Sequence, residues 1–445
     1  MENMDSTVIA TSLPAIAADL GVNPLALKLA LTAYLVSLAV FIPISGWVAD
    51  RFGARTVFAA AIGVFMAGSL LSAASSTLPA FVAARFLQGI GGAMMVPVGR
   101  LVLMRAIPKS QYVAALSYLT MPALLGPIIG PALGGAITQY AHWRWIFLIN
   151  VPISILGLVL VLRHIPNLRE DTVPRFDLAG FLLSGSGLAL LMLGLSSLGG
   201  HLMPAALTWS SIAGGIGLLL AYLRHYRRVE HPVLDLGLLR LPTFANGVLG
   251  GSLFRIGVGA SPFLLPLLLQ IGFGMDPLHS GLLTCASAIG ALFMKTMTIR
   301  ILRRWGFRRV LVVNALAASA GMAACAVFTA ATPAVVIFVV LLLAGCLRSL
   351  QFTSLQAIQF ADTSREAMSR ATSLSSMAQR LSQSLGIAVG AWVLQFASDL
   401  RGDGQLLAED FVPAFLVVAL LAASSMLMHR TMASGAGAEL SGHRG

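Results

Sequence analysis

Charged side chains are scarce in this sequence. They make up 10% of its 445 residues, whereas 57% are hydrophobic and the mean hydropathy is +0.87. Soluble domains carry about 25% charged residues. Apolar runs recur along the whole chain, many near the ~20 residues that a helix needs to cross the ~30 Å hydrocarbon core of a bilayer. This composition excludes an ordinary soluble protein and indicates a membrane protein.

Cysteine and histidine are also sparse. The three cysteines fall inside apolar runs without a C-x-x-C pair, which excludes a disulfide framework. The eight histidines fall in loops, at span ends or in the tail, so the spans lack metal-ligand clusters. No nucleophile–base arrangement is evident either, so we expect no enzyme, no metal and no cofactor. A basic segment followed by an apolar one and a cleavage site is lacking, so we expect no cleavable signal peptide.

Thirteen apolar runs are predicted to cross the membrane as helices, since lipid leaves the backbone of an open strand edge unsatisfied. They cover residues 27–49, 56–76, 79–104, 112–138, 143–163, 177–198, 205–223, 243–271, 281–301, 311–331, 333–357, 371–396 and 410–429. Residues 1–20 resemble the second half of a further span. We therefore expect an incomplete first helix, with the chain start assigned downstream of the true one.

The distribution of positive charge predicts the orientation. Loops on the two sides of the membrane alternate along the chain. Most of the 29 lysines and arginines lie in the loops on one side, and only Lys28, Arg144 and Arg401 lie in the loops on the other side. The positive-inside rule places the first set and the C-terminus in the cytoplasm. Basic loops beside anionic lipid account for the net charge of +12, so we expect no nucleic-acid partner.

A short internal repeat predicts two similar halves. Residues 51–57 match residues 304–310 at four of seven positions, each after the second span of its half. Parallel repeats in transporters place the substrate site between the halves at the midplane. The expected units are a six-helix bundle with an incomplete first helix, a two-helix insert with flanking cytoplasmic loops, a second six-helix bundle and a cytoplasmic tail. They cover residues 1–163, 164–242, 243–430 and 431–445.

The second predicted span ends in the sequence GWVADRFGAR. Gly46 is expected to permit close helix approach, Asp50 to sit at a helix end, and Gly53 to turn the chain. Arg51 and Arg55 then face the cytoplasmic headgroups. The general preference of short cytoplasmic loops for glycine and arginine explains every feature of this loop except Asp50.

This stretch resembles the G-x-L-A-D-R-x-G-R signature of the major facilitator superfamily, although Val48 replaces leucine and the basic run after Arg55 is absent. Residues 4–14 resemble a first-helix motif of its fourteen-helix drug:proton antiporters. Residues 85–93 and 143–152 resemble motifs of the fourth and sixth helices. The antiporter motif of the fifth helix is matched by Gly126, Pro127, Gly130, Pro131, Gly134 and Gly135. The resemblance covers nearly the whole chain and is closest to the multidrug-resistance branch.

The resemblance implies an all-α membrane protein with the major facilitator fold, two six-helix bundles plus a two-helix central insert. It implies a proton-coupled exporter of small amphiphilic compounds in the bacterial inner membrane, driven by the proton gradient through alternating access. Its partners would be the lipid bilayer and a small-molecule substrate; a periplasmic adaptor cannot be read from the sequence. An exporter of an endogenous metabolite or organic anion, and a non-transporting membrane sensor or scaffold, stay open as alternatives.

Asp5 is predicted to be the only acid inside a span, and a costly intramembrane carboxylate indicates function. A carboxylate that alternates between a desolvated site and a cation can load and release a proton. The resemblance implies that Arg85 tunes this acid. Static pairing of Asp5 with an arginine, and snorkelling of Arg85 to the surface, are the alternatives.

Small residues at Gly126, Gly130 and Gly134 form one helix face suited to close packing. The resemblance implies that this face seals the two halves toward one side; an interface that merely packs is the alternative. Polar, soft or cationic residues that could line the substrate cavity, or merely pack, are Gln88, Met94, Met95, Asn150, Arg255, Arg348, Gln356 and Gln383. Four arginines, Arg85, Arg255, Arg348 and Arg380, are predicted to lie deep in the spans, where Asp5 is the one predicted acid. This excess of positive charge favours neutral, zwitterionic or acidic substrates over cationic drugs.

Overall fold

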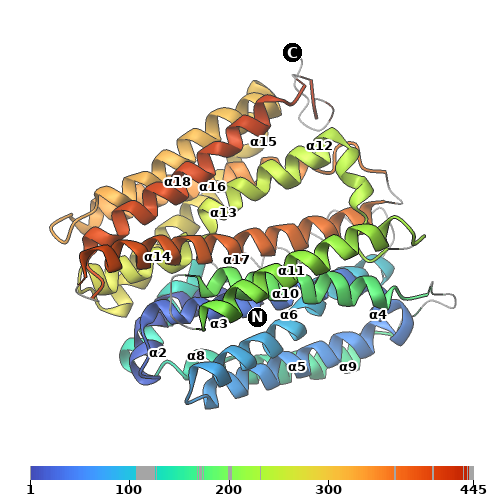
Figure 1. Ribbon diagram of the computed structural model, residues 1–445, viewed down its shortest axis with the longest axis horizontal. Helices are drawn as coiled ribbons and strands as arrows, with labels where there is room; N and C mark the ends of the chain where they lie inside the picture. Colours follow the sequence, from blue (N-terminus) through green and yellow to red (C-terminus); the bar gives the residue numbers. More distant parts are fainter. Residues whose placement is uncertain are drawn as a thin grey trace.

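The computed structural model describes residues 2–106, 126, 128–167, 169, 173, 175–198, 203–230, 232–364, 367–402, 405–433, 435–437 and 439. All regular secondary structure in these residues is helical (Figure 1). The helices run roughly side by side, and the N-terminal and C-terminal halves lie next to each other across the bundle. The prediction of an all-α protein is confirmed for the described residues.

The N-terminal half begins with a helical segment that changes geometry twice before the first long helix. Pro14 stands in the first turn of its third piece, where a missing N–H is tolerated. The helices of this half are α1 (Glu2–Val8), η1 (Ile9–Ser12), α2 (Leu13–Asp19), α3 (Lys28–Phe41), α4 (Ser45–Phe52), α5 (Ala54–Ala74), α6 (Leu78–Ala106), residues 128–140, α8 (Trp145–Leu148) and α9 (Asn150–His164).

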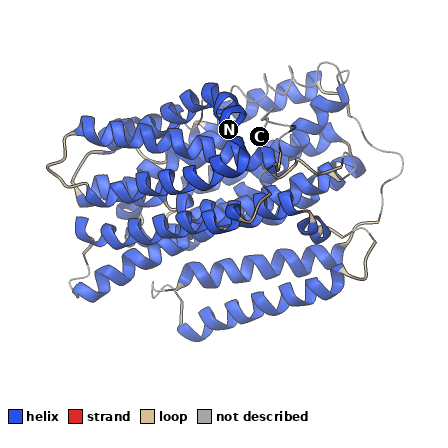
Figure 2. Cartoon of the chain, turned by 90° about the horizontal axis from the view of Figure 1, so that it is seen from above, coloured by secondary structure: helices blue, strands red, loops and turns tan. Residues whose placement is uncertain are grey.

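Two helices, α10 (Leu178–Ser197) and α11 (Ala205–Tyr226), form a hairpin between the halves in sequence. Figure 2 shows this pair along one side of the molecule, at the bottom of the view. Helix α10 packs on α3, and the Lys28 Nζ donates to the Leu198 carbonyl at 3.3 Å. Asp177 caps the start of α10 and lies 2.7 Å from His225 at the end of α11.

The C-terminal half contains two π-helical segments, η6 (Asn246–Gly250) and η7 (Leu268–Gly272), which lie on either side of α13 (Gly251–Gly259) and α14 (Ser261–Leu267). Helices α3 and α17 pack against each other across the contact between the halves. The other helices of this half are α12 (Pro242–Ala245), α15 (Pro277–Ala323), α16 (Ala334–Ile358), α17 (Met368–Arg401) and α18 (Phe411–Arg430).

The internal repeat has a backbone counterpart. Gly53 ends α4 with φ 93°, and Gly306, at the matching position of the repeat, has φ 69°. Glycine is the residue that adopts positive φ without steric cost. The bend at Gly306 lies between the predicted spans 281–301 and 311–331, the second of which continues past the end of α15 at Ala323. Both copies of the repeat therefore turn the chain in the same way.

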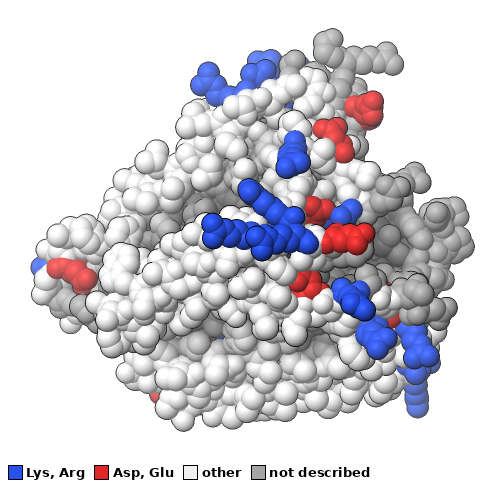
Figure 3. All heavy atoms as spheres, turned by 45° about the vertical axis from the view of Figure 1, so that its right-hand side comes forward, with Lys and Arg blue, Asp and Glu red and all other residues white. Residues whose placement is uncertain are grey.

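Ten helical stretches in the described residues are long and apolar enough to cross a membrane, and the longest, Pro277–Val327, contains that bend. The predicted span 371–396 is helical within α17, whereas 112–138 lies largely outside the described residues. Figure 3 shows basic side chains gathered toward one end of the molecule, next to a broad uncharged surface. The described chain is therefore a multi-pass membrane protein.

Candidate functional site

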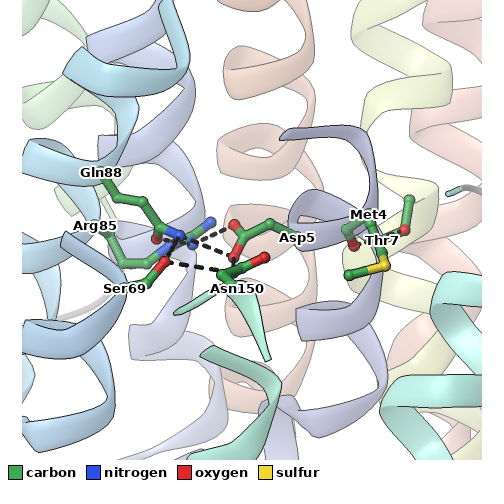
Figure 4. Close-up of polar contacts among 7 residues, drawn as sticks. All are labelled: Met4, Asp5, Thr7, Ser69, Arg85, Gln88 and Asn150. Carbon is green, nitrogen blue, oxygen red and sulfur yellow. Dashed lines mark hydrogen bonds and ion pairs between the residues drawn. The ribbon is translucent and has the colours of Figure 1, made fainter. Parts of the chain in front are cut away.

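Asp5 lies on α1 and is surrounded by polar side chains of the N-terminal half (Figure 4). The Arg85 Nη1 donates to its Oδ2 at 2.6 Å. Gln88 Nε2 and Asn150 Nδ2 each donate to its Oδ1 at 2.9 Å. The carboxylate is 3% exposed and accepts three hydrogen bonds, one from a cation and two from side-chain amides. Protonation of Asp5 would therefore rearrange its partners.

Four helices supply this cluster. Arg85 and Gln88 lie one turn apart on α6 and so share a face. Ser69 of α5 accepts a hydrogen bond from Gln88 Nε2 at 2.7 Å, and Asn150 begins α9. The structure thus places Gln88 and Asn150, two of the predicted cavity residues, in the Asp5 cluster. Ser69 was not predicted, because one serine in an apolar helix carries no signal.

The Arg85 guanidinium also lies over aromatic rings. Its central carbon is 4.3 Å from the centroid of the Tyr34 ring and 5.5 Å from that of Phe147. Such contacts stabilise a cation in a poorly hydrated site. The side chain is 0% exposed, so the alternative that Arg85 snorkels to the surface is wrong. The structure brings Asp5 and Arg85 together, and their role in proton coupling stays a prediction.

The expectation that Asp5 is the only acid within a span is wrong. Glu2 lies three residues earlier on the same helix and is 6% exposed. Its Oε1 accepts a hydrogen bond from Arg380 Nη2 at 2.5 Å. Sequence reasoning placed every acid except Asp5 outside the spans, because the contact between Glu2 and Arg380 joins residues more than 370 positions apart in the chain. Arg380 is therefore paired, which reduces the predicted excess of deep cations.

The remaining deep arginines have different surroundings. Arg255 is 1% exposed and lies 5.9 Å from the Phe352 ring centroid, and its three nitrogens have no hydrogen-bond partner among the described residues. Gly251 leaves room for it, since an added Cβ there would lie 2.7 Å from Arg255 Nη1. Arg348 Nη2 instead donates to Ser287 Oγ at 2.7 Å. Only Arg348 of these two borders the cavity described next.

A cavity of about 150 Å³ lies between the two halves. The first helix contributes Thr7, Ala10 and Thr11 to its wall, and the C-terminal half contributes Arg348, several hydroxyl groups and a larger apolar surface. Drug-sized ligands occupy pockets of roughly 300–1,000 Å³. The cavity must therefore widen, through movement of the halves or of side chains, to admit a molecule of that size.

The other predicted cavity residues are distributed elsewhere. Gln356 lines a second cavity of about 470 Å³ within the C-terminal half, beside Phe307. Met94 and Met95 pack against two different apolar clusters of the core. Gly259 of α13 approaches the backbone of Gln383 closely. A substrate contact for any of these residues stays a prediction.

The GWVADRFGAR loop packs against the linker that leads to the α10–α11 hairpin. Asn167 Oδ1 accepts a hydrogen bond from the Thr56 backbone N–H at 3.3 Å, and the Asn167 side chain occupies the space that a Cβ at Gly53 would need. The Trp47 and Phe176 ring centroids are 4.6 Å apart. The expectation for Gly46 is wrong, because an added Cβ there would meet nothing within 4 Å. Asp50 lies in the last turn of α4, as predicted.

Arg51 and Arg55, the basic residues of this loop, differ in exposure. Arg51 is exposed in the last turn of α4, and Arg55 is partly buried in the first turn of α5. A role of the loop in conformational switching stays a prediction.

The antiporter motif packs on the first helix, as its small residues predict. A Cβ at Gly130 would meet the Thr7 side chain, and one at Gly134 would meet the Val8 carbonyl. The Thr7 hydroxyl donates to the Gly126 carbonyl at 3.2 Å. Pro127 lies outside the described residues. This helix therefore lies too close to α1 and η1 for larger side chains on that face.

The same motif also meets the C-terminal half through a reciprocal contact. A Cβ at Gly135 would meet the Pro277 carbonyl, and a Cβ at Gly281 would meet the Pro131 carbonyl. Gln270 Nε2 adds a hydrogen bond to the Thr11 carbonyl at 2.8 Å. Gly281 and Gln270 belong to no motif, so sequence reasoning missed them. Pro131 and Thr11, which take part in these contacts, also border the cavity, and sealing of the halves toward one side by this face stays a prediction.

Comparison with known proteins gives consistent results. The family model described as Major Facilitator Superfamily matches residues 1–387 and 247–432. Relatives from Klebsiella pneumoniae (strain 342) and Salmonella heidelberg (strain SL476) are each 41% identical. The alignments cover 88% of this chain and 83% or 84% of theirs. Both carry the provisional name multidrug resistance protein MdtD.

Solved structures of transporters agree with the predicted major facilitator fold, which is thereby confirmed. The inward-open xylose transporter XylE from E. coli has a TM-score of 0.64 at 15% identity, over 97% of this chain and 92% of that one. A peptide transporter POT in complex with sulfate has a TM-score of 0.70 at 14% identity, over 96% and 91%.

Proposed function

Because this chain belongs to the major facilitator superfamily of membrane transporters, we propose that it is a proton-coupled exporter of small amphiphilic compounds. It works by alternating access, in which the two halves open the cavity between them to one side of the membrane and then the other. The provisional multidrug-resistance name of the 41% identical relatives supports this substrate class. Membership in a family of membrane transporters supports a transport function over an enzymatic one.

One observation carries the proposal: a single helical segment forms both the Asp5 cluster and a wall of the cavity. Asp5 contacts Arg85, Gln88 and Asn150 on one side of α1. Thr7 points away from that cluster (Figure 4) and borders the cavity. A change in the Asp5 contacts on protonation can therefore move the cavity wall. This link is the minimum that coupling between proton and substrate requires.

A second candidate function is export of an endogenous metabolite or organic anion. Arg348 on the cavity wall favours it, since an acidic group can form a charge-assisted hydrogen bond with the guanidinium. The bacterial inner membrane, with basic loops and the C-terminus in the cytoplasm, is the proposed location and orientation.

Purified protein in proteoliposomes tests the proposal. A pH gradient is imposed, and a panel of cationic, zwitterionic and acidic amphiphiles is added while internal pH and compound accumulation are recorded. We expect compound movement coupled to opposite proton movement. Folded protein that moves neither protons nor any compound would favour the sensor or scaffold, and movement of acids alone would favour the anion exporter.

A further inference from the structure

An ion pair joins the two halves of the molecule next to the Asp5 cluster. Glu2 lies on α1 in the N-terminal half, and Arg380 lies on α17 in the C-terminal half. The Arg380 and Glu2 side chains are 22% and 6% exposed, and their charged atoms are 2.5 Å apart. Loss of either charge has large consequences at such a site, because the remaining charge is poorly hydrated and uncompensated.

Glu2 and Asp5 lie about one helical turn apart but are held by different parts of the protein. The donors to Asp5 come from α6 and α9, both in the N-terminal half. The donor to Glu2 comes from the C-terminal half. When the halves move relative to each other, the contacts of Asp5 can persist, whereas the contact between Glu2 and Arg380 must change.

Tyr34 of α3 lies near both Glu2 and the Arg85 partner of Asp5. Its ring lies against Arg85, the partner of Asp5. A Cβ added at Gly92 would be 3.1 Å from Tyr34 Oη and 3.7 Å from Glu2 Cγ, so both groups border the same point. The Tyr34 hydroxyl is buried and has no hydrogen-bond partner among the described residues. It is therefore placed near Glu2 as an alternative partner to Arg380.

We propose that Glu2 is a second proton-accepting carboxylate and that its ion pair with Arg380 is a latch between the halves, released by protonation. The inference rests on the proposed proton-coupled function. A proton taken up from water on one side neutralises the Glu2 carboxylate and removes its attraction for Arg380. The proton leaves toward the other side when the ion pair forms again. Among the described residues, the other charged or titratable groups near this site are Tyr34, Asp5 and Arg85.

Distances between spin labels on the two halves test the latch. Ser76 and Ala331 are exposed positions in the N-terminal and C-terminal halves. They are labelled in protein whose three buried cysteines are replaced by serine, and the protein is placed in lipid nanodiscs at a series of pH values. We expect acidification to shift the population between two distances by at least about twofold. In Glu2→Gln the population should already be shifted at neutral pH and should respond weakly to acid.

Asp410→Asn is the matched control. Asp410 pairs with Arg401 at 2.9 Å, with side chains 4% and 25% exposed, and Arg401 lies on α17 like Arg380. This pair stays within the C-terminal half, so its loss should leave the pH response intact. The double variant Glu2→Gln/Arg380→Gln leaves no unpaired charge and serves if Glu2→Gln fails to fold. It should show the same weak response.

Two results would overturn the latch. One is a pH response in Glu2→Gln, or in the double variant, equal to that of the parent protein. The other is an equal loss of response in Asp410→Asn. Proton-driven transport by the parent protein is measured in the same preparations. Its absence would count against the proposed function, while the label distances would still report on the latch.

Discussion

The Arg348 guanidinium donates a hydrogen bond to the Ser287 hydroxyl, 2.7 Å away, where both residues border the cavity between the halves. A neutral hydroxyl compensates a guanidinium less well than a carboxylate does. An acidic ligand in the cavity would therefore gain more from this arginine than a cationic one.

The first prediction is that acidic or zwitterionic amphiphiles stabilise the protein more than quaternary ammonium compounds do. Arg348→Gln should weaken binding of the acidic compounds about tenfold or more, since a hydrogen bond to a charged group contributes ~1.5–3 kcal/mol. Ligand-dependent shifts in melting temperature measure this. Arg255→Gln is the control, because Arg255 lies against Phe352 rather than on the cavity wall. Tighter binding of lipophilic cations, with both arginines dispensable, would contradict the prediction.

The second prediction concerns Asp5. Asp5→Asn keeps the size of the side chain but removes the group that gains and loses a proton, so efflux driven by a pH gradient should fall to background. Exchange of substrate without a gradient should continue, which would show that the variant is folded. Both are measured with labelled substrate in proteoliposomes. Gradient-driven efflux at the parent rate would exclude Asp5 as the coupling acid.

The third prediction concerns the reciprocal glycine contact. Gly281→Ala and Gly135→Ala each place a methyl group against a backbone carbonyl of the other half. Overpacking of this kind costs roughly 1–3 kcal/mol, so this contact should loosen, the end of the cavity next to it should become more open, and transport should slow. Gly217→Ala on α11 is the control, because its Cβ would meet nothing within 4 Å. The accessibility of labels at this end of the cavity and the transport rates are compared among the variants. Equal effects of Gly281→Ala, Gly135→Ala and Gly217→Ala would contradict the prediction.

The fourth prediction is a pH dependence of stability at Asp276, which lies between two spans and caps α15. The backbone N–H of His279 donates to its side chain and, against the opposing effect of burial, keeps the pKa of Asp276 below its usual value of 3.8. A lowered pKa stabilises the folded state above the unfolded pKa, and this contribution is lost as pH falls through the folded pKa.

Asp276→Ala should therefore cost about 1 kcal/mol at neutral pH, the usual loss for a helix cap. The difference in free energy of unfolding between the parent protein and the variant should shrink below pH 3.8. Melting temperatures of the parent protein and the variant from neutral to acidic pH measure it. Asp276→Asn keeps a capping oxygen and should therefore lose less stability than Asp276→Ala. A stability difference between the parent protein and Asp276→Ala that is constant with pH would contradict the lowered pKa of Asp276.

Much of the fold was predictable because its signals are local. Apolar runs long enough to cross a bilayer identify the helices, and the repeat around Gly53 and Gly306 predicted two similar halves with matching turns. The cost of a carboxylate in a span indicated Asp5, and an arginine nearby in the folded protein was the expected compensation.

Which side chains bind each other, in contrast, was decided by tertiary structure. The sequence alone determined that the chain crosses the membrane repeatedly and that Asp5 is buried at a cost. Only the packed helices determined that Gln88 and Asn150 bind Asp5 rather than line the cavity, and that Arg380 reaches back to Glu2. The physical reason is that burial in a lipid span depends on one helix, whereas a hydrogen bond or a glycine contact depends on two helices that lie far apart in the chain.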